Sequence, residues 1–239
     1  MRSRTAKVKD RELRPPSGTV SIPGMDKNQP DQTMWDTRYD RPDYLFGREP
    51  AVFLTRNAHR LKPESTVLCV AEGEGRNAVY LAGLGMRVIA FDTSGVGLGK
   101  ARARAANAGV EVDFHLAGVD DWDWADTQFD VVAAIFIQFT PPDARAAVFA
   151  GLDAALRPGG LLLLHGFAPR QVDYGTGGPP RAENMYTLEL LNSAFPGYEI
   201  LHQADYDENV DAGPGHNGLA AMVDFVARKP LSVDTGKQL

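Results

Sequence analysis

The chain contains 239 residues, of which 44% are hydrophobic and 23% are charged, and its net charge at pH 7 is −6. This charge provides no positive field to attract the phosphates of a nucleic acid or an anionic membrane. No apolar run approaches the roughly 20 residues of a membrane-spanning helix. The single cysteine, Cys69, excludes an intramolecular disulfide and a thiolate zinc cluster. We therefore expect a cytoplasmic protein without a metal ion, whose partners are neither nucleic acids nor membranes.

The N-terminal residues 1–31 differ in composition from the rest of the chain. They mix basic residues with prolines and glycines and show neither helical nor strand periodicity. The basic residues are not followed by the apolar stretch that a signal peptide requires. We expect a disordered N-terminal tail over residues 1–31, one ordered domain over residues 32–230, and a C-terminal tail over residues 231–239.

From residue 49 to residue 165 the chain alternates helical and strand-like patterns. Short apolar runs predict strands over residues 66–71, 87–91, 111–116, 129–136 and 161–165. Apolar spacing, with Pro50 near one helix start and Gly109 at one helix end, predicts helices over residues 49–60, 76–84, 96–108 and 141–156. Regular alternation of this kind predicts a parallel sheet with helices on both faces.

The remaining residues follow a different pattern. A glycine- and proline-rich loop over residues 171–182 precedes a short helix over 187–195 and two strands over 198–204 and 219–227. The polar connection 205–218 leaves no room for a crossover helix, so these two strands should pair antiparallel. The predicted fold is an α/β, doubly wound, seven-stranded, mostly parallel sheet with a C-terminal antiparallel strand.

A glycine pattern and a carboxylate follow the first two predicted strands. Gly73-x-Gly75-x-x-Ala78 opens a helix, at a place where glycines let a ligand approach the backbone. Asp92 ends the second strand, where a carboxylate can accept hydrogen bonds from both hydroxyls of an adenosine ribose. The pair fits a nicotinamide dinucleotide and S-adenosylmethionine (SAM) alike. The structural alternatives are a tight turn without a ligand and, for Asp92, the N-cap of a helix.

Three further features favour SAM over a dinucleotide. Residues 117–123, after the third strand, are acidic and aromatic and can frame an adenine. Residues 156–160 (LRPGG) end a helix and lead into the fifth strand. The closing antiparallel pair is not ordinarily needed by a dinucleotide dehydrogenase.

At these residues the chain resembles the class I SAM-dependent methyltransferases, which have a Rossmann-like fold. The similarity covers about residues 33–229 and is strongest in 67–77 (VLCVAEGEGRN), 88–92 (VIAFD), 129–132 (FDVV) and 156–160 (LRPGG). Within that class the chain is most similar to small bacterial enzymes related to the tellurite-resistance methyltransferase, with the thiopurine methyltransferases as more distant relatives. Residues 35–50, 75–77 and 174–179 carry the narrower similarity.

The resemblance implies a SAM site at the carboxyl ends of the strands. Glu72 and the two turn glycines would line the methionine and ribose portions, Asp92 would hold the ribose, and the end of the fourth strand would lie beside the donor. Cys69, Ala71 and Gly118 depart from the family pattern. The predicted cofactor contacts are Trp35, Tyr39, Glu72, Gly73, Gly75, Arg76, Asn77, Asp92, Thr93, Gly118, Val119, Ile135 and Phe136.

Two pairs among these contacts have a second interpretation. Trp35 and Tyr39 are one helical turn apart, so their rings share a face that either attracts a sulfonium or packs in the core. Arg76 and Asn77 either contact the donor or orient the entry segment. Both interpretations stay open at the level of the sequence.

Candidates for catalysis are His165, Tyr174 and His216. His165 ends the fifth strand at the mouth of the sheet, where an ordinary pKa near 6.5 suits a general base and where a packed histidine is the alternative. Tyr174 belongs to the glycine-rich loop, which is either a lid over the acceptor or a surface loop. His216 precedes the last strand.

The predicted function is SAM-dependent methylation of a small-molecule acceptor. A thiol, a chalcogen oxyanion or a thiopurine-like compound is favoured, because soft nucleophiles need little help with deprotonation. One alternative is an NAD-dependent oxidoreductase that uses Gly73 and Asp92. The other is a non-catalytic SAM-binding protein, favoured by the departures at Cys69, Ala71 and Gly118. We expect a monomer or a weak homodimer.

Overall fold

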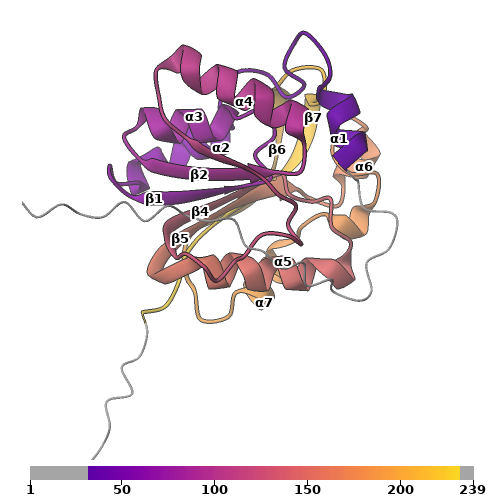
Figure 1. The fold of residues 1–239 in the computed structure, drawn as a ribbon. Coiled ribbons are helices and arrows are strands. Elements are labelled where there is room, and N and C mark those ends of the chain that lie inside the picture. Colours follow the sequence, from indigo (N-terminus) through magenta and orange to yellow (C-terminus); the bar gives the residue numbers. More distant parts are fainter. Residues whose placement is uncertain (1–31, 232–239) are drawn as a thin grey trace, which may run out of the picture.

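The computed structural model describes residues 32–231, which form a seven-stranded sheet with helices on both faces (Figure 1). The strands are β1 (Thr66–Val70), β2 (Arg87–Asp92), β3 (Asp113–Leu116), β4 (Phe129–Ile135), β5 (Leu156–Phe167), β6 (Glu199–Asp211) and β7 (Asn217–Arg228). Their order in the sheet is β3-β2-β1-β4-β5-β7-β6. β7 runs antiparallel to both of its neighbours, whereas the other pairs are parallel. The predicted doubly wound, mostly parallel fold is confirmed.

Helices cover the sheet from both sides. They are α1 (Gln32–Tyr39), α2 (Val52–Asn57), α3 (Arg76–Gly83), α4 (Gly95–Ala108), α5 (Pro142–Ala155), α6 (Gln171–Tyr174) and α7 (Leu188–Ala194), with short 3-10 helices η1 (Ala58–Arg60) and η2 (Ala182–Asn184). α2, α3 and α4 lie on one face and α5 and α7 on the other, while α1 and α6 lie at the carboxyl ends of the parallel strands (Figure 1).

The core explains why the buried stretches of the central strands, residues 67–70 of β1 and 131–135 of β4, are apolar. Successive residues of β1 point to opposite faces, so Val67 and Cys69 pack in one cluster with Leu81 of α3, and Leu68 packs in another with Leu152 of α5. A strand buried on both faces needs an apolar residue at every position. These two cores hold the central strands, and with them the carboxyl edge of the sheet.

The C-terminal hairpin is longer than predicted. β6 and β7 pair from Glu199 with Arg228 to Asp211 with Asn217, which leaves only residues 212–216 as the turn. The predicted polar connection 205–218 is therefore mostly strand, because exposed and partly buried positions alternate along β6. Residues 156–160 likewise lie inside β5 instead of forming a turn before it.

The carboxyl ends of β1 and β4 have strained backbone. Ala71 follows β1 with φ 48° and Phe136 follows β4 with φ 59°, so both are non-glycine residues in the left-handed region. β1 and β4 are neighbours at the point where the strand order reverses, which is where open α/β sheets bind ligands. Strain of about 1–3 kcal/mol per residue is typical of functional sites. This edge is therefore the candidate site.

The sequence analysis also makes predictions about the two tails, membrane spans and metal sites. The predicted tail over residues 1–31 and residues 232–239 lie outside the described residues. Within residues 32–231, no helix combines the length and apolar character needed to cross a membrane. In the same range, no group of three histidine, cysteine or acidic residues is placed to hold a metal ion.

Candidate functional site

A cavity of about 770 Å³ lies at the carboxyl edge of the sheet, within the range of roughly 300–1,000 Å³ found for small-molecule sites. Its β1–β3 half is formed by α1 and the segments after β1, β2 and β3: Trp35, Tyr39, Glu72, Arg76, Asn77, Asp92, Thr93 and residues 117–121. Its β4–β7 half is formed by the segments after β4 and β5 and by the β6–β7 turn: Ile135, Phe136, Gln138, Phe139, Phe167, residues 178–181, Asn184, Gly215 and His216. All predicted cofactor contacts except Gly73 and Gly75 line this cavity.

The β1–α3 turn places a carboxylate at the start of α3. Oε1 of Glu72 accepts hydrogen bonds from the backbone N–H groups of Asn77 and Ala78, both at 2.8 Å. These are free N–H groups of a helix N-terminus, which otherwise attract an anion. Burial raises the pKa of Glu72 to about 7, although the two hydrogen bonds oppose that rise. The side chain of Glu72 therefore occupies the anion-binding end of the helix.

The two glycines of this turn serve packing. A Cβ at Gly73 would lie 2.6 Å from the hydroxyl oxygen of Tyr39, and a Cβ at Gly75 would lie 2.7 Å from Cβ of Ala101. Both glycines also have positive φ, 63° and 83°. The prediction that they contact the cofactor has no support from this geometry, because they shape the turn that presents Glu72.

Asp92 ends β2 and lines the β1–β3 half, with 5% of its surface exposed. Its Oδ2 accepts a hydrogen bond from the Gly73 N–H at 2.7 Å, and its Oδ1 accepts one from the Ser94 N–H at 2.8 Å. Burial raises the pKa of Asp92 to about 6. The N-cap of α4 is Ser94, whose hydroxyl accepts from the Gly97 N–H, so Asp92 is not the helix cap. Each carboxylate oxygen keeps capacity for a hydroxyl donor.

Helix α1 covers this half with aromatic rings. The rings of Trp35 and Tyr39 stack with 5.4 Å between their centroids, and the ring of Phe46 lies 6.4 Å from each of them. Asp36 fastens α1 to the start of α4, because its Oδ1 accepts from the Ser94 hydroxyl and from a backbone N–H. These hydrogen bonds hold the pKa of Asp36 below its ordinary value. The predicted shared face of Trp35 and Tyr39 is confirmed.

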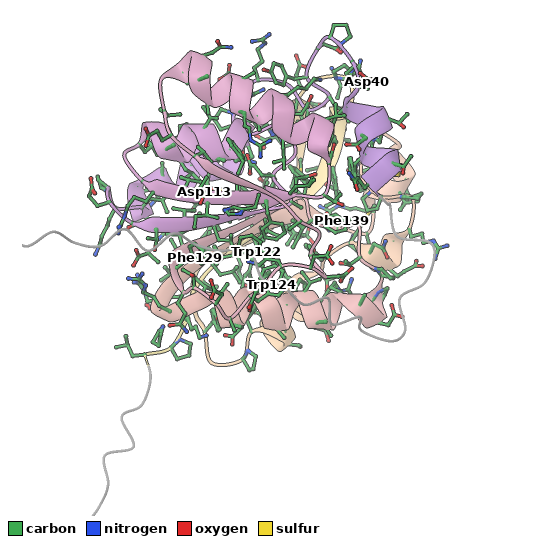
Figure 2. The ribbon with its side chains drawn as sticks, in the orientation of Figure 1. Asp40, Asp113, Trp122, Trp124, Phe129 and Phe139 are labelled. Atoms are coloured by element: carbon green, nitrogen blue, oxygen red, sulfur yellow. The ribbon has the colours of Figure 1, made fainter. Side chains whose placement is uncertain are left out.

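Aromatic packing holds the segment after β3. The Trp122 ring stacks on the Phe91 ring at 4.5 Å, and Nε1 of Trp124 donates a hydrogen bond to the Val119 carbonyl at 3.0 Å. Figure 2 shows Trp122 and Trp124 between the sheet and α5. Gly118, Val119 and the neighbouring carboxylate of Asp120 line the cavity. The segment therefore presents both backbone and acidic groups to a ligand.

Rings also form much of the β4–β7 half. The Phe136 ring lies 4.9 Å from the Phe167 ring and 5.4 Å from the His216 ring, and the last two rings are 4.8 Å apart. Burial lowers the pKa of His216 to about 4, and the nearby charges of Arg76 and His165 add to this effect. The imidazole is neutral at pH 7 and only weakly basic. His216 lines the cavity, but the prediction that it is a catalytic base has no support from this environment.

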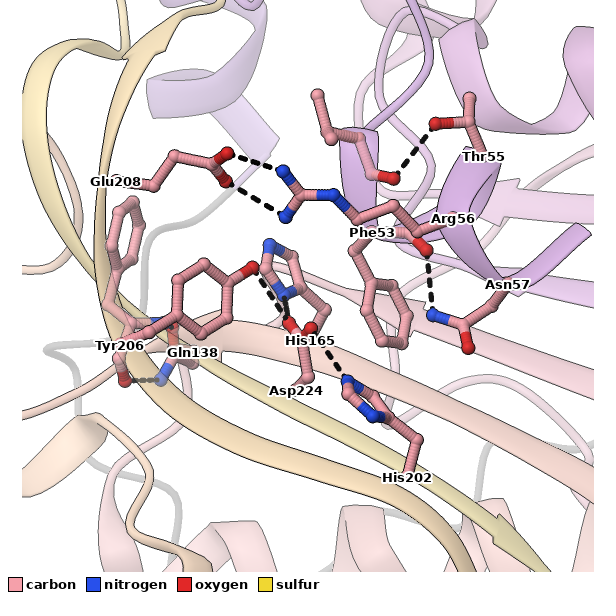
Figure 3. A network of polar contacts seen from close by, with 12 residues as sticks. Phe53, Thr55, Arg56, Asn57, Gln138, His165, His202, Tyr206, Glu208 and Asp224 are labelled. Atoms are coloured by element: carbon pink, nitrogen blue, oxygen red, sulfur yellow. Dashed lines mark hydrogen bonds and ion pairs between the residues drawn. The ribbon is translucent and has the colours of Figure 1, made fainter.

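His165 does not line the cavity. It is buried, and its Nδ1 lies 2.7 Å from Oδ1 of Asp224 (Figure 3). Asp224 also contacts Nε2 of His202 at 3.2 Å and accepts a hydrogen bond from the Tyr206 hydroxyl at 3.2 Å (Figure 3). The ring of His165 reaches the cavity wall through Phe136, at 4.8 Å between centroids. The catalytic role predicted for His165 therefore has no support from the geometry, which gives it a packing role.

Helix α6 fastens the glycine-rich loop to the sheet. The Tyr174 hydroxyl donates to Oδ2 of Asp207 at 2.9 Å, so this side chain points to β6 and does not line the cavity. Oε1 of Gln171 accepts from the Ala221 N–H at 2.7 Å, and its Nε2 donates to the loop. Residues 178–181 of the loop reach the cavity. The glycine-rich loop, which the sequence predicts as a lid, is thus fixed to the sheet at its start. The catalytic role predicted for Tyr174 has no support from this geometry.

The wall residues that the predicted site omits include Phe139, Phe167 and Asn184. Phe167 is the last residue of β5, two positions beyond His165, so a longer fifth strand would have placed it at the carboxyl edge. Phe139 and Asn184 lie outside the regular strands, where apolar periodicity gives no signal. Both require the tertiary structure to be found.

Known proteins resemble this chain in part of its sequence. A family profile described as a methyltransferase domain matches residues 67–160, from β1 into β5. Uncharacterized proteins of Mycobacterium tuberculosis H37Rv and Mycobacterium bovis are each 35% identical over 101 residues, which is 42% of this chain and 36% of theirs. The match thus spans about a third of the length of these curated relatives.

Solved structures resemble the chain over most of its length. One comes from a study of the conversion of a disulfide bond into a thioacetal group during echinomycin biosynthesis, with a TM-score of 0.69, 20% identity, and coverage of 85% of this chain and 93% of that one. TehB from Haemophilus influenzae has a TM-score of 0.62 and 16% identity over 83% of this chain and 66% of its own. Magnesium protoporphyrin IX methyltransferase (ChlM) from Synechocystis PCC 6803, with bound S-adenosylhomocysteine (SAH), has a TM-score of 0.56 and 18% identity over 74% and 80%.

At these identities the solved structures establish the fold, and the family profile establishes the domain. The profile covers the β1–α3 turn, the end of β2 and the end of β4, which together provide much of the cavity wall. Residues 67–160 therefore match a methyltransferase domain, and the described residues have the Rossmann-like fold of methyltransferases.

Proposed function

We propose that this domain transfers a methyl group from SAM to a small molecule, with SAM in the β1–β3 half of the cavity and the acceptor in the β4–β7 half. The observation that carries the proposal is the pair of carboxylates after β1 and β2. Asp92 offers hydrogen-bond acceptors to the ribose hydroxyls, and Glu72 fills the helix end that a phosphate would need. The methyltransferase-domain match and the SAH-bound structure of ChlM support the choice of cofactor.

The same carboxylates argue against a nicotinamide dinucleotide. The pyrophosphate of such a cofactor binds at free N–H groups of a helix N-terminus, and here those of Asn77 and Ala78 already donate to Glu72. Asp120 and Asp121 add two further acidic side chains to the β1–β3 half. This half therefore has four acidic side chains, Glu72, Asp92, Asp120 and Asp121, against the two arginines Arg38 and Arg76. A wall with an excess of acidic groups repels an anionic cofactor and attracts a cationic one. The oxidoreductase alternative is therefore disfavoured.

When bound, SAM supplies a methyl group on a sulfonium, which a nucleophile attacks in line while the carbon–sulfur bond breaks and its electron pair stays on sulfur. The residues of the chain hold the two partners in line and keep water out. Trp35 and Tyr39 present ring surface that stabilises a sulfonium by cation–π attraction. Phe136 follows β4, next to β1, so its ring lies at the boundary between the two halves.

For the acceptor we propose a soft nucleophile, namely a thiol, a chalcogen oxyanion or a thiopurine-like compound. Among the described residues, no carboxylate lines the β4–β7 half, and its one histidine is a weak base. A hard nucleophile such as an alcohol would need a base to remove its proton. A soft nucleophile reacts without a strong base, which agrees with a wall that contains no carboxylate and only a weakly basic histidine.

Thermal unfolding tests the choice of cofactor. SAM, SAH, NAD and NADP are added separately, each at about 100 times its expected dissociation constant. Ligand at this excess adds about 2.7 kcal/mol, which raises the melting temperature by about 5–10 °C for a domain of this size. We expect this shift with SAM and SAH. A shift with NAD or NADP and none with SAM or SAH would contradict the proposal.

A further inference from the structure

Two buried polar atoms in the wall of the β4–β7 half have no partner. His216 is 3% exposed and Asn184 is 8% exposed, and both line the cavity. Within residues 32–231, Nε2 of His216 and Oδ1 of Asn184 form no hydrogen bond. Leaving a buried polar group unpaired costs about 1–3 kcal/mol, so native proteins leave few of them. Because both residues line the same cavity, a ligand bound there could form the hydrogen bonds that these two atoms lack.

The two side chains are held in place by separate parts of the fold. Asn184 ends η2, and the guanidinium of Arg145 donates to the Glu183 carbonyl next to it at 2.7 Å. His216 ends the β6–β7 turn, where the Gly215 N–H donates to a backbone carbonyl of the segment before α2 at 2.8 Å. Each segment is thus held by a hydrogen bond to its own or a neighbouring backbone carbonyl, which fixes the backbone from which the two side chains project.

The surroundings of these atoms are flat and mostly apolar, and Arg181 is the charged residue in the wall of this half. The Phe136 and Phe167 rings lie 5.4 Å and 4.8 Å from the His216 ring, and Pro179 and Pro180 add to the same half. Such surfaces pack best against a planar ring. The imidazole is neutral at pH 7 because burial, with the charges of Arg76 and His165, lowers its pKa to about 4. Neither polar atom thus offers a formal charge to a ligand.

We infer that His216 and Asn184 form a neutral two-point anchor that hydrogen-bonds the polar edge of a planar, uncharged acceptor. The inference rests on the proposed function and narrows its acceptor. It gives His216 a binding role in place of proton transfer, and it makes Asn184 a specificity-determining residue.

Three small probes test the anchor in the full-length protein saturated with SAH. Indazole is a planar bicyclic ring with an N–H donor beside a nitrogen acceptor, indene has the same shape without polar atoms, and benzoate is a planar anion. Dissociation constants are measured by ligand-observed NMR at pH 7.5. We expect indazole to bind at least about ten-fold more tightly than either of the others, since one net hydrogen bond gives about this factor.

Variants assign the preference to the two residues. In the double variant His216→Phe with Asn184→Leu, which keeps the shapes, indazole and indene should bind within about two-fold of each other. His216→Gln, which restores a polar group, should retain part of the preference. His59→Phe changes an exposed histidine outside the cavity wall and should leave all three probes unaffected.

Several results would overturn the anchor: equal binding of indazole and indene, tightest binding of benzoate, no binding of any probe at millimolar concentration, or an unchanged preference in the double variant. If the double variant does not fold, the probe comparison in the wild-type protein and in His216→Gln decides. SAH is titrated into each protein before it is saturated for the probe measurements. Failure of the wild-type protein to bind SAH contradicts the proposed function, whereas the probe comparison repeated without SAH still decides the anchor.

Discussion

Replacing Asp224 with alanine should lower the free energy of unfolding by about 3 kcal/mol and the melting temperature by about 6–12 °C. Asp224 is 3% exposed on β7, between β5 and β6. Its carboxylate is the shared acceptor for His165, His202 and Tyr206. Without it, the buried imidazole of His165 and the half-buried hydroxyl of Tyr206 lose their acceptor. Loss of the partner of a buried polar group costs about 1–3 kcal/mol. Differential scanning calorimetry measures the change.

The control for this variant is Asp205→Ala on β6, whose carboxylate pairs with Arg170 at the surface. Such exposed pairs add little stability, so the melting temperature should change far less. Equal effects of the two substitutions would contradict the role given to the buried network.

The difference in the free energy of unfolding between the wild-type protein and Asp224→Ala should become smaller at low pH. Burial raises the pKa of Asp224, but the hydrogen bonds and charges of His165 and His202 outweigh this, so its pKa in the folded protein lies below the ordinary value. A lowered folded pKa gives stability that is present above the unfolded pKa of about 3.9 and is lost as the pH falls through the folded value. The gap between wild type and Asp224→Ala should therefore shrink below about pH 4. A gap that widens there would be inconsistent with the charged carboxylate.

Substitution of Asp92 with asparagine should weaken the binding of SAH on the order of 100-fold. The change removes the negative charge and one acceptor oxygen at the position assigned to the ribose hydroxyls. Hydrogen bonds to a charged group contribute about 1.5–3 kcal/mol each, and 1.4 kcal/mol corresponds to ten-fold in affinity. Because burial raises the pKa of Asp92 to about 6, the affinity of the wild-type protein should also decline below pH 6. Isothermal titration calorimetry measures both effects.

Asp113→Asn serves as the matched control, because Asp113 is an exposed carboxylate at the amino end of β3, far along the strand from the cavity (Figure 2). It should bind SAH like the wild-type protein. Unchanged SAH affinity in Asp92→Asn, with the fold intact by calorimetry, would remove Asp92 from the donor site.

The sequence predicted the elements whose signals are local. The buried stretches of parallel strands are continuous apolar runs, which predict β1 and β4, and Asp92 is a candidate because it ends such a run. The spacing of Trp35 and Tyr39 likewise predicted their shared helical face. Each of these signals lies within one element and needs no knowledge of distant contacts.

Long-range contacts explain where the structure differs from the sequence predictions or gives them no support. Gly73 resembles a ligand-binding glycine, but the Tyr39 hydroxyl takes the space next to it. His165 resembles a base at a strand end, but its Nδ1 forms a hydrogen bond with Asp224, which is 59 residues later in the chain. Residues 205–211, the second half of β6, resemble a loop because β6 is an edge strand whose polar side chains face solvent. Asn184 gave no sequence signal, since only the folded chain shows its unpaired oxygen beside the cavity.

Methyl transfer itself is measured most directly by incubating the protein with SAM that carries a deuterated methyl group and with small acceptors: thiophenol, 2-mercaptopyridine, selenite and tellurite. Mass spectrometry then quantifies SAH and the labelled product. We predict equal amounts of SAH and of one labelled acceptor, formed faster than without protein and lost in Asp92→Asn. If the protein binds SAM but forms no SAH above the protein-free rate with any of these acceptors, the claim of soft-nucleophile methylation is contradicted, and a non-catalytic SAM-binding protein becomes the better description.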